Sequence, residues 1–110
     1  LVVWGGEFGR TPMRELRHGI VTETYGRDHH KEAFTMWMAG AGVKGGTSIG
    51  STDDLGFFVA EDPVHVRDMQ ATMLHALGLE SQELTYPYQG LEQKLTGVGD
   101  TPRVISDIFA

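Results

Sequence analysis

Two short stretches of the chain contain side chains that could do chemistry. Glu7 is followed by Arg10, and Asp28, His29 and His30 stand in a row. Carboxylate and imidazole ligands together suit Zn²⁺, Mn²⁺ or Fe²⁺, and a carboxylate such as Glu7 can also act as a general base. The two stretches therefore indicate a metal-dependent or acid–base site.

Each stretch also has a plainer explanation. Glu7 could pair with Arg10 in a loop, and residues 28–30 could form a solvated polar turn. Neighbouring side chains on an extended segment point to opposite sides. At most Asp28 with His30, or His29 with a distant partner, would then face one ion. A complete site needs ligands from elsewhere.

Three further histidines and one glycine-rich stretch are weaker candidates. His65 stands where an extended segment turns into a predicted helix, whereas His18 and His75 are expected at the surface. Backbone N–H groups of residues 40–46 could cradle an anion, but their spacing matches no phosphate-binding loop.

Two predicted strands flank these candidates. The apolar residues 1–4 stop at Gly5 and Gly6, which is typical of a strand buried in a parallel sheet and followed by a tight loop. In open α/β sheets, chemistry takes place beyond the carboxyl ends of strands, which is where Glu7 and Arg10 would lie. A second strand is predicted at residues 34–39, after the histidines.

The rest of the chain predicts one clear helix among shorter elements. An apolar stripe, spaced by three and four residues, begins between Pro63 and Asp68 and ends at Gly78; it contains Val66, Met69, Met73, Leu74 and Leu77. The other expected elements are a helical turn at 13–17, short strands at 20–25, 57–60 and 93–96, a turn at 51–56, a polar connection at 79–90 and a last helix at 102–109.

Composition narrows the class of protein. A chain of 110 residues, with 40% hydrophobic residues and no apolar run long enough to cross a membrane, fits a single domain over residues 1–110. Fifteen glycines favour a loop-rich α/β fold. The net charge of −6 argues against a nucleic-acid partner, and the lack of cysteine excludes disulfides and thiolate metal sites. Because the chain starts without Met, inside an apolar run, we expect it to be the C-terminal fragment of a longer protein.

Four segments carry a family resemblance: VVWGGEFGRTP, GRDHHKEAFTMWMAGAGVKGGTSIGSTDDLG, VHVRDMQATMLHALGLE and YQGLEQKLTG. In this order, they resemble the C-terminal part of the sulfatase-like domain-of-unknown-function 1501 proteins, which are grouped with the alkaline phosphatase superfamily. The resemblance implies an α/β fold, here part of an alkaline-phosphatase-like three-layer α/β/α sandwich around a mixed sheet. It also suggests an exported parent, periplasmic or extracellular.

The resemblance also implies roles for particular residues. In the superfamily, an Asp-His loop after a strand holds metal; here Glu7-Phe8-Gly9-Arg10 occupies that place, with no histidine after Glu7, and Asp28-His29 occupies the later metal-binding place. The implied metal ligands are Glu7, Asp28 and His29, for a divalent ion such as Zn, Mn, Mg or Ca. Arg10 would contact an anionic substrate, and Asp68 would be structural. The nucleophile lies in the N-terminal half of such proteins, and nothing here matches it.

Three functional hypotheses follow. The first is the C-terminal portion of a metal-dependent phosphate- or sulfate-ester hydrolase-like protein, inactive as an isolated chain because its nucleophile and remaining ligands are elsewhere. The alternative is a non-catalytic structural or binding module, which the missing histidine after Glu7 favours. The third is a free-standing small α/β protein. For a fragment, the expected partners are the N-terminal portion of the parent and further copies of the chain, with no membrane.

Overall fold

A computed structural model describes residues 1–16, 18–20, 23 and 26–110. The chain divides into two compact units. Unit 1 comprises Leu1–Val2, Met38–Ser48 and Val64–Ala110, and unit 2 comprises Val3–Trp37 and Ile49–Pro63.

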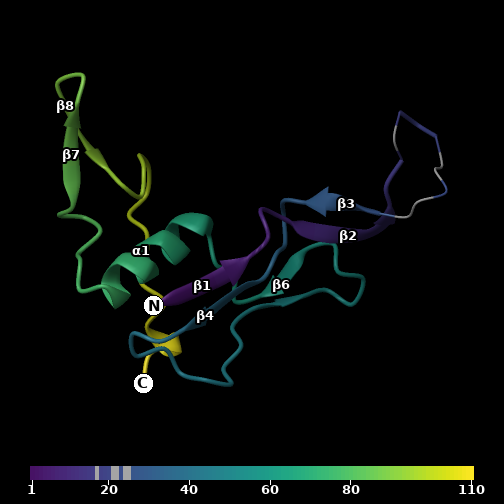
Figure 1. Cartoon of the computed structure of the whole chain (residues 1–110), viewed down its shortest axis with the longest axis horizontal. Coiled ribbons are helices and arrows are strands. Elements are labelled where there is room, and N and C mark those ends of the chain that lie inside the picture. The colour runs from purple at the N-terminus through teal and green to yellow at the C-terminus, as the bar shows by residue number, and fades with distance from the viewer. Residues whose placement is uncertain (17, 21–22, 24–25) are drawn as a thin grey trace. The chain divides into compact units, whose positions relative to one another are not determined.

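The elements are short and follow one another closely (Figure 1). They are β1 (Val2–Gly5), β2 (Gly9–Arg14), β3 (Arg27–His30), β4 (Met36–Ala39), β5 (Ser51–Thr52), β6 (Val59–Glu61), α1 (Val66–Ala76), β7 (Thr85–Tyr88), β8 (Leu91–Lys94) and the 3₁₀ helix η1 (Ser106–Ile108). The strands form two-stranded sheets, which pair β1 with β4, β2 with β3, β5 with β6, and β7 with β8.

The expected three-layer sandwich around a mixed sheet is wrong. In the part of the chain that the structure describes, strands pair only two at a time, and the β2–β3, β5–β6 and β7–β8 ladders are antiparallel. Neighbouring parallel strands need a crossover of a dozen or more residues, usually a helix. Here six strands precede α1, the one α-helix of the described residues. Antiparallel pairs joined without a helix therefore take the place of a layered sheet.

The opening strand forms but is not buried. Val2 and Trp4 of β1 are 60% and 73% exposed, so the apolar run at residues 1–4 does not mark a strand covered on both faces. In the part of the chain that the structure describes, few apolar side chains are buried. Ala33 and Ala71 are the buried hydrophobic residues there. No described helix has the length and apolar character needed to span a membrane.

In unit 2, β2 and β3 form an irregular antiparallel pair. Gly9 lies opposite His30, Arg10 opposite His29, and Arg14 opposite Arg27, with an irregularity between Arg10 and Arg14. The helical turn expected at residues 13–17 is wrong at its start, because Met13 and Arg14 belong to β2. The pairing of β2 with β3 thus overrides the local preference that Pro12 suggested. The strand expected at residues 20–25 falls mostly outside the described residues.

A tight loop in unit 2 joins β5 to β6. The carboxylate of Asp53 accepts hydrogen bonds from the backbone N–H groups of Phe57 and Phe58 at 2.8 and 3.2 Å. The backbone N–H of Gly56 also donates to the carbonyl oxygen of Asp53 at 3.0 Å. One aspartate therefore organises this turn. The turn expected at 51–56 is wrong at its start, because Ser51 and Thr52 form β5, and the strand expected at 57–60 begins slightly later, at Val59.

In unit 1, α1 occupies the predicted position. His65 is its N-cap and Gly78 follows its C-terminal end with a φ of +77°, a left-handed conformation that glycine adopts without a steric penalty. The expected helix at 102–109 is reduced to the three residues of η1. Two further backbone bonds join this C-terminal stretch to residues 42–44: the N–H of Lys44 donates to the carbonyl oxygen of Ile108, and the N–H of Ala110 donates to that of Gly42.

The expected polar connection and edge strand at 79–96 contain a complete hairpin. Strands β7 and β8 pair from Thr85 opposite Lys94 to Tyr88 opposite Leu91. The two residues of the turn, Gln89 and Gly90, have φ values of +50° and +78°. Positive φ at both central positions is the requirement of a type I′ turn, whose twist matches that of the strands.

Candidate functional site

The candidate site in unit 2 is a carboxylate–imidazole pair on the β2–β3 hairpin. The Oε1 atom of Glu7 lies 2.5 Å from the Nε2 atom of His29. Both side chains are accessible, with 63% and 56% of their surface exposed. The structure thus brings together two of the three predicted metal ligands, although 22 residues separate them along the chain.

Strand pairing explains why these two residues meet. His29 lies opposite Arg10, near the start of β2. Glu7 precedes β2 by two residues, so it lies close to His29 on the partner strand. Gly9 enters this strand with its backbone pressed against the carbonyl group of Ala33, where an added Cβ would overlap the oxygen at 2.1 Å. Only glycine permits so close an approach. Gly9 therefore sets the path of the chain between Glu7 and β2.

Arg10 and Phe8 complete the surroundings of the pair. The Nη2 atom of Arg10 lies 3.7 Å from Oε1 of Glu7, and its Nη1 donates to the backbone carbonyl of Arg27 at 3.2 Å. The ring of Phe8 meets the His29 imidazole edge to face, with centroids 5.6 Å apart. The guanidinium is therefore held beside the carboxylate at a solvent-exposed edge of the hairpin.

The electrostatics favour an ionised carboxylate. A hydrogen bond from its own backbone N–H lowers the pKa of Glu7 most, and the hydrogen bond from His29 lowers it further. An ionised Glu7 accepts from Nε2–H, so a neutral His29 has its lone pair on Nδ1. For Glu7 and His29 to bind the same ion, the metal would replace the proton on Nε2, the nitrogen that faces Glu7, and the proton of the ring would move to Nδ1.

Asp28 and His30 are not brought into this pair. Alternation along β3 directs their side chains to the face opposite His29. His30 is 6% exposed and donates from Nε2 to the carbonyl oxygen of Gly56 at 3.1 Å, so it ties β3 to the β5–β6 loop. Asp28 is exposed. Among the described residues, no three histidine or acidic side chains gather in a group that could hold an ion.

The pair fits half of a metal site. Carboxylate oxygen and imidazole nitrogen are ligands that Zn²⁺ accepts at about 2.0 to 2.2 Å, in sites of four ligands. Two ligands of one tetrahedral ion stand about 3 Å or more apart, so the 2.5 Å contact between Glu7 and His29 would have to open slightly. The remaining ligands would come from outside the pair.

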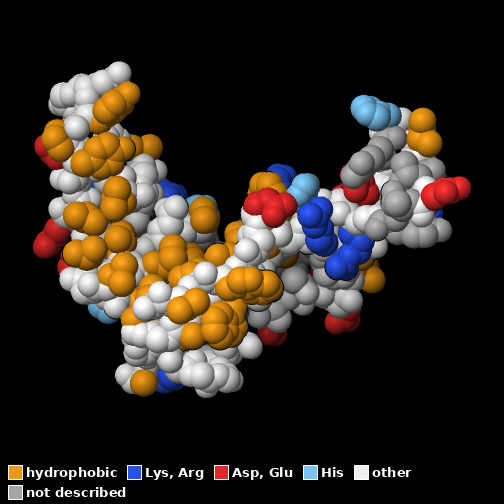
Figure 2. All heavy atoms as spheres, in the orientation of Figure 1, with side chains coloured by type: hydrophobic (Ala, Val, Ile, Leu, Met, Phe, Trp, Pro, Cys, Tyr) orange, Lys and Arg blue, Asp and Glu red, His pale blue; other side chains and the backbone are white. Residues whose placement is uncertain are grey.

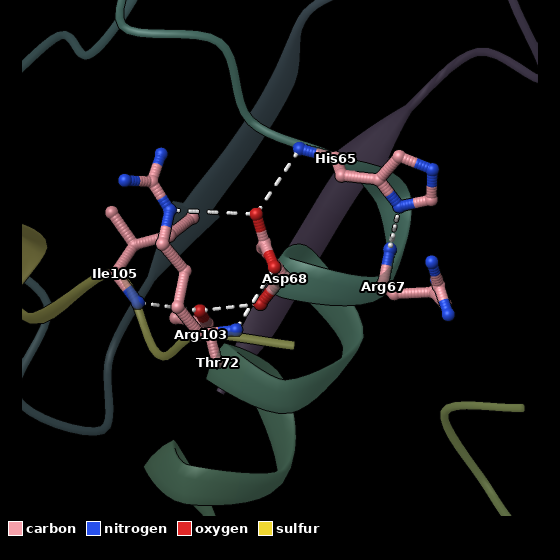
Figure 3. Close-up of polar contacts among 6 residues, drawn as sticks. All are labelled: His65, Arg67, Asp68, Thr72, Arg103 and Ile105. Carbon is pink, nitrogen blue, oxygen red and sulfur yellow. Dashed lines mark hydrogen bonds and ion pairs between the residues drawn. The ribbon is translucent and has the colours of Figure 1, made fainter. Parts of the chain in front are cut away.

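A second polar cluster, in unit 1, was not predicted as a group (Figure 3). Asp68 accepts from the backbone N–H of His65 at 3.4 Å and from that of Arg103 at 2.9 Å, and its carboxylate lies 3.5 Å from the Arg103 side chain. The Nδ1 atom of His65 in turn accepts from the N–H of Arg67 at 3.1 Å. The sequence signal was His65 followed three positions later by an acid, which is the spacing of a capping box.

This cluster has a structural role. Asp68 is the N3 residue of the capping box of α1 and also holds the chain at Arg103, as its expected structural role requires. The Arg67 guanidinium donates to the carbonyl oxygens of Val98 and Asp100 at 2.8 and 3.4 Å. The adjoining depression has a volume of about 230 Å³, below the usual range of small-molecule sites, about 300 to 1,000 Å³. We therefore place the candidate chemistry at Glu7 and His29.

Comparison with known families agrees with part of the resemblance seen in the sequence. A family model described as "Protein of unknown function (DUF1501)" matches residues 1–109. The chain belongs to this family. No curated protein and no solved structure gives a significant match. The DUF1501 assignment thus covers both the Glu7–His29 pair and the Asp68 cluster.

Proposed function

We propose that this DUF1501 chain forms the C-terminal portion of a metal-dependent phosphate- or sulfate-ester hydrolase-like protein. The contact between Glu7 and His29 is the observation that supports the proposal. It joins a carboxylate and an imidazole at one exposed edge, with the Arg10 guanidinium 3.7 Å from the same carboxylate oxygen.

Each of the three residues has a role in the proposal. Glu7 and His29 supply two ligands of a divalent ion, which would polarise the ester when bound. Arg10 holds an oxyanion of the substrate, because its planar fork matches a tetrahedral phosphate or sulfate group. Asp28 is left out of the ligand set, since it faces away from His29 on β3. The nucleophile and the other ligands come from another part of the longer protein.

Metal titration of the chain by calorimetry tests the ligand pair. We expect Zn²⁺ or Mn²⁺ to bind weakly, and Glu7→Ala and His29→Ala each to weaken that binding by about tenfold or more, because each removes one of two ligands. His75→Ala is the matched control: its imidazole is also about half exposed and also stands near a carboxylate, that of Glu80 at 3.6 Å, but in unit 1. Binding that survives both ligand substitutions unchanged would remove the proposed site.

A second candidate, a non-catalytic binding module, is favoured by a different observation. Many large apolar side chains are exposed, among them Trp4, Leu55 and Val98 at 73%, 71% and 86%. Exposed apolar surface on this scale is typical of protein interfaces. Assays of the longer protein with nitrophenyl phosphate and nitrophenyl sulfate separate the candidates. Turnover that Glu7→Ala abolishes favours the hydrolase, and no turnover of either ester favours the module.

A further inference from the structure

One face of the β2–β3 hairpin carries a row of guanidinium groups. Residues directly opposite each other in an antiparallel pair share a face, as do residues two apart on one strand. Arg10 lies opposite His29, Arg14 lies opposite Arg27, and Arg27 is two residues before His29. All three arginines are exposed. We call Arg10, Arg14 and Arg27 the basic face.

Positive charge gathers in this part of unit 2. Figure 2 shows Lys and Arg side chains gathered over β2 and β3, beside a histidine and an acidic side chain. The whole chain has a net charge of −6, so this concentration of positive charge opposes the general trend. A local field of this sign attracts anions to one place on an otherwise acidic protein.

The side chains of Arg10 and Arg27 differ in how their N–H donors are used. Arg10 donates one N–H to the backbone carbonyl of Arg27, and its guanidinium lies beside the carboxylate of Glu7. Within the described residues, by contrast, no ion pair involves the side chain of Arg27. The Arg27 end of the basic face therefore has donors to offer to a ligand, separate from those that hold Arg10 in place.

We infer that the Arg27 end of the basic face is a second anion subsite, and that the substrate carries two phosphate or sulfate groups. Arg27 and His29 are two residues apart on β3, so the second subsite lies about 7 Å from the Glu7–His29 pair. One oxyanion binds at Arg10 beside this pair, and the other binds at Arg27. The inference deepens the proposed function and rests on it for the identity of the first group as the ester that reacts.

Binding of anionic probes to the whole chain tests this subsite without turnover. The buffer is first freed of metals on a chelating resin. Inorganic triphosphate is compared with inorganic phosphate, and a disulfated disaccharide is compared with sulfate. We expect at least one of the two longer probes to bind more tightly than its single-group counterpart, and the one that does identifies the group, phosphate or sulfate. Salt should weaken this binding, because the charges are exposed.

Substitutions locate the binding. Arg27→Ala should weaken binding of the longer probe about fivefold, the upper range for an exposed ion pair, and leave single phosphate within about twofold. Arg27→Lys keeps the charge and should retain part of the affinity. Lys44→Ala, which removes one exposed positive charge from unit 1, is the matched control and should change neither.

Two results would overturn the inference. One is that neither longer probe binds more tightly than its single-group counterpart. The other is that Arg27→Ala and Lys44→Ala weaken binding equally, which would show attraction by net charge alone. The proposed function fails separately, through the metal titration of Glu7→Ala and His29→Ala, because the anion probes are measured without metal.

Discussion

The backbone N–H of Ile105 donates a hydrogen bond of 3.0 Å to the hydroxyl oxygen of Thr72, 33 residues earlier in the chain. Thr72 is fully buried in α1, and its hydroxyl donates in turn to the carbonyl oxygen of Asp68 at 2.6 Å. One side chain thus uses both its donor and its acceptor capacity. Thr72 and Asp68 together fasten the C-terminal segment to the helix (Figure 3).

Replacing this hydroxyl should destabilise unit 1. Thr72→Val conserves shape but leaves the Ile105 N–H without its acceptor, so we expect a loss of about 1 to 3 kcal/mol in the free energy of unfolding. Urea denaturation measures the loss, and hydrogen exchange should show faster exchange at Ile105. Thr47→Val, at an exposed position of the same unit, should stay within about 0.5 kcal/mol. Equal effects in the two variants would contradict the structural role of Thr72.

The Asp53 loop should show a defined dependence on pH. Hydrogen bonds from the backbone N–H groups of Phe57 and then Phe58 lower the pKa of Asp53 below its ordinary value of 3.8. A carboxyl group whose pKa is lower in the folded state contributes stability that is present above pH 3.8. That stability is lost as the pH falls through the lower folded-state value.

Amide exchange at Phe57 and Phe58 measures this dependence. Above pH 3.8, Asp53→Asn should exchange faster than the wild type at both amides, and the difference should vanish in stronger acid. Asp54→Asn is the matched control, because Asp54 is the exposed neighbour of Asp53. A difference between wild type and Asp53→Asn that persists unchanged in strong acid would show that the carboxylate charge is not the cause.

The carboxyl group of Glu7 should titrate below its ordinary pKa of 4.5. The hydrogen bond from its own backbone is the largest cause, and the hydrogen bond from His29 comes second. In NMR titration, His29→Ala should therefore raise the pKa of Glu7 only part of the way back to 4.5. Arg10→Ala should raise it by less, since Arg10 is the weakest of these causes. A pKa of Glu7 that does not respond to His29→Ala would mean that the two side chains do not meet in solution.

The turn of the β7–β8 hairpin should respond to the preferences of a type I′ turn. Gln89→Asn should stabilise the hairpin by about 0.5 kcal/mol, because asparagine tolerates positive φ better than glutamine. Gly90→Ala should destabilise it by about 1 kcal/mol, since its φ is +78°. Gly45→Ala is the control: its φ is not in the positive range and an added Cβ would meet no atom within 4 Å. Thermal unfolding of the three variants provides the comparison.

The exposed apolar side chains should make the isolated chain associate with itself. Large hydrophobic residues are exposed on several elements, including Trp4 of β1 and Tyr88 and Leu91 of the β7–β8 hairpin. Association would remove this surface from water, at about 25 cal/mol for each Å² covered. Sedimentation velocity over a range of concentrations should show the sedimentation coefficient rising with concentration. A compact monomer at every concentration would contradict the prediction.

Some features were predictable because neighbouring residues decide them. The apolar stripe from Val66 to Leu77 specifies α1, and Gly78 marks its end. Alternation along an extended segment already separated His29 from Asp28 and His30. Glu7 and His29 were both candidates by residue type, and the family resemblance then named them, together with Asp28, as metal ligands.

Other features depend on which segments meet, and local pattern does not encode that choice. Residues 1–4 look like a buried parallel strand, yet β1 is largely exposed and, among the strands that the structure describes, pairs only with β4. Residues 102–109 have helical spacing, yet Asp68 and Thr72 capture the backbone at Arg103 and Ile105. The prediction of a three-layer sandwich was wrong for the same reason. A mixed sheet requires parallel crossovers, which the observed order of elements does not provide.

By itself, the sequence determined the end of α1 and the short range in which it begins, which residue types could bind a metal or an anion, and that neighbouring histidines on an extended segment take opposite faces. These depend on backbone geometry over a few residues. Only the tertiary structure decided that Glu7 reaches His29, that Arg14 stands opposite Arg27, and that Thr72 holds Ile105. Each of these contacts joins segments separated in the chain. Its formation depends on strand register and on the satisfaction of backbone hydrogen bonds across the fold.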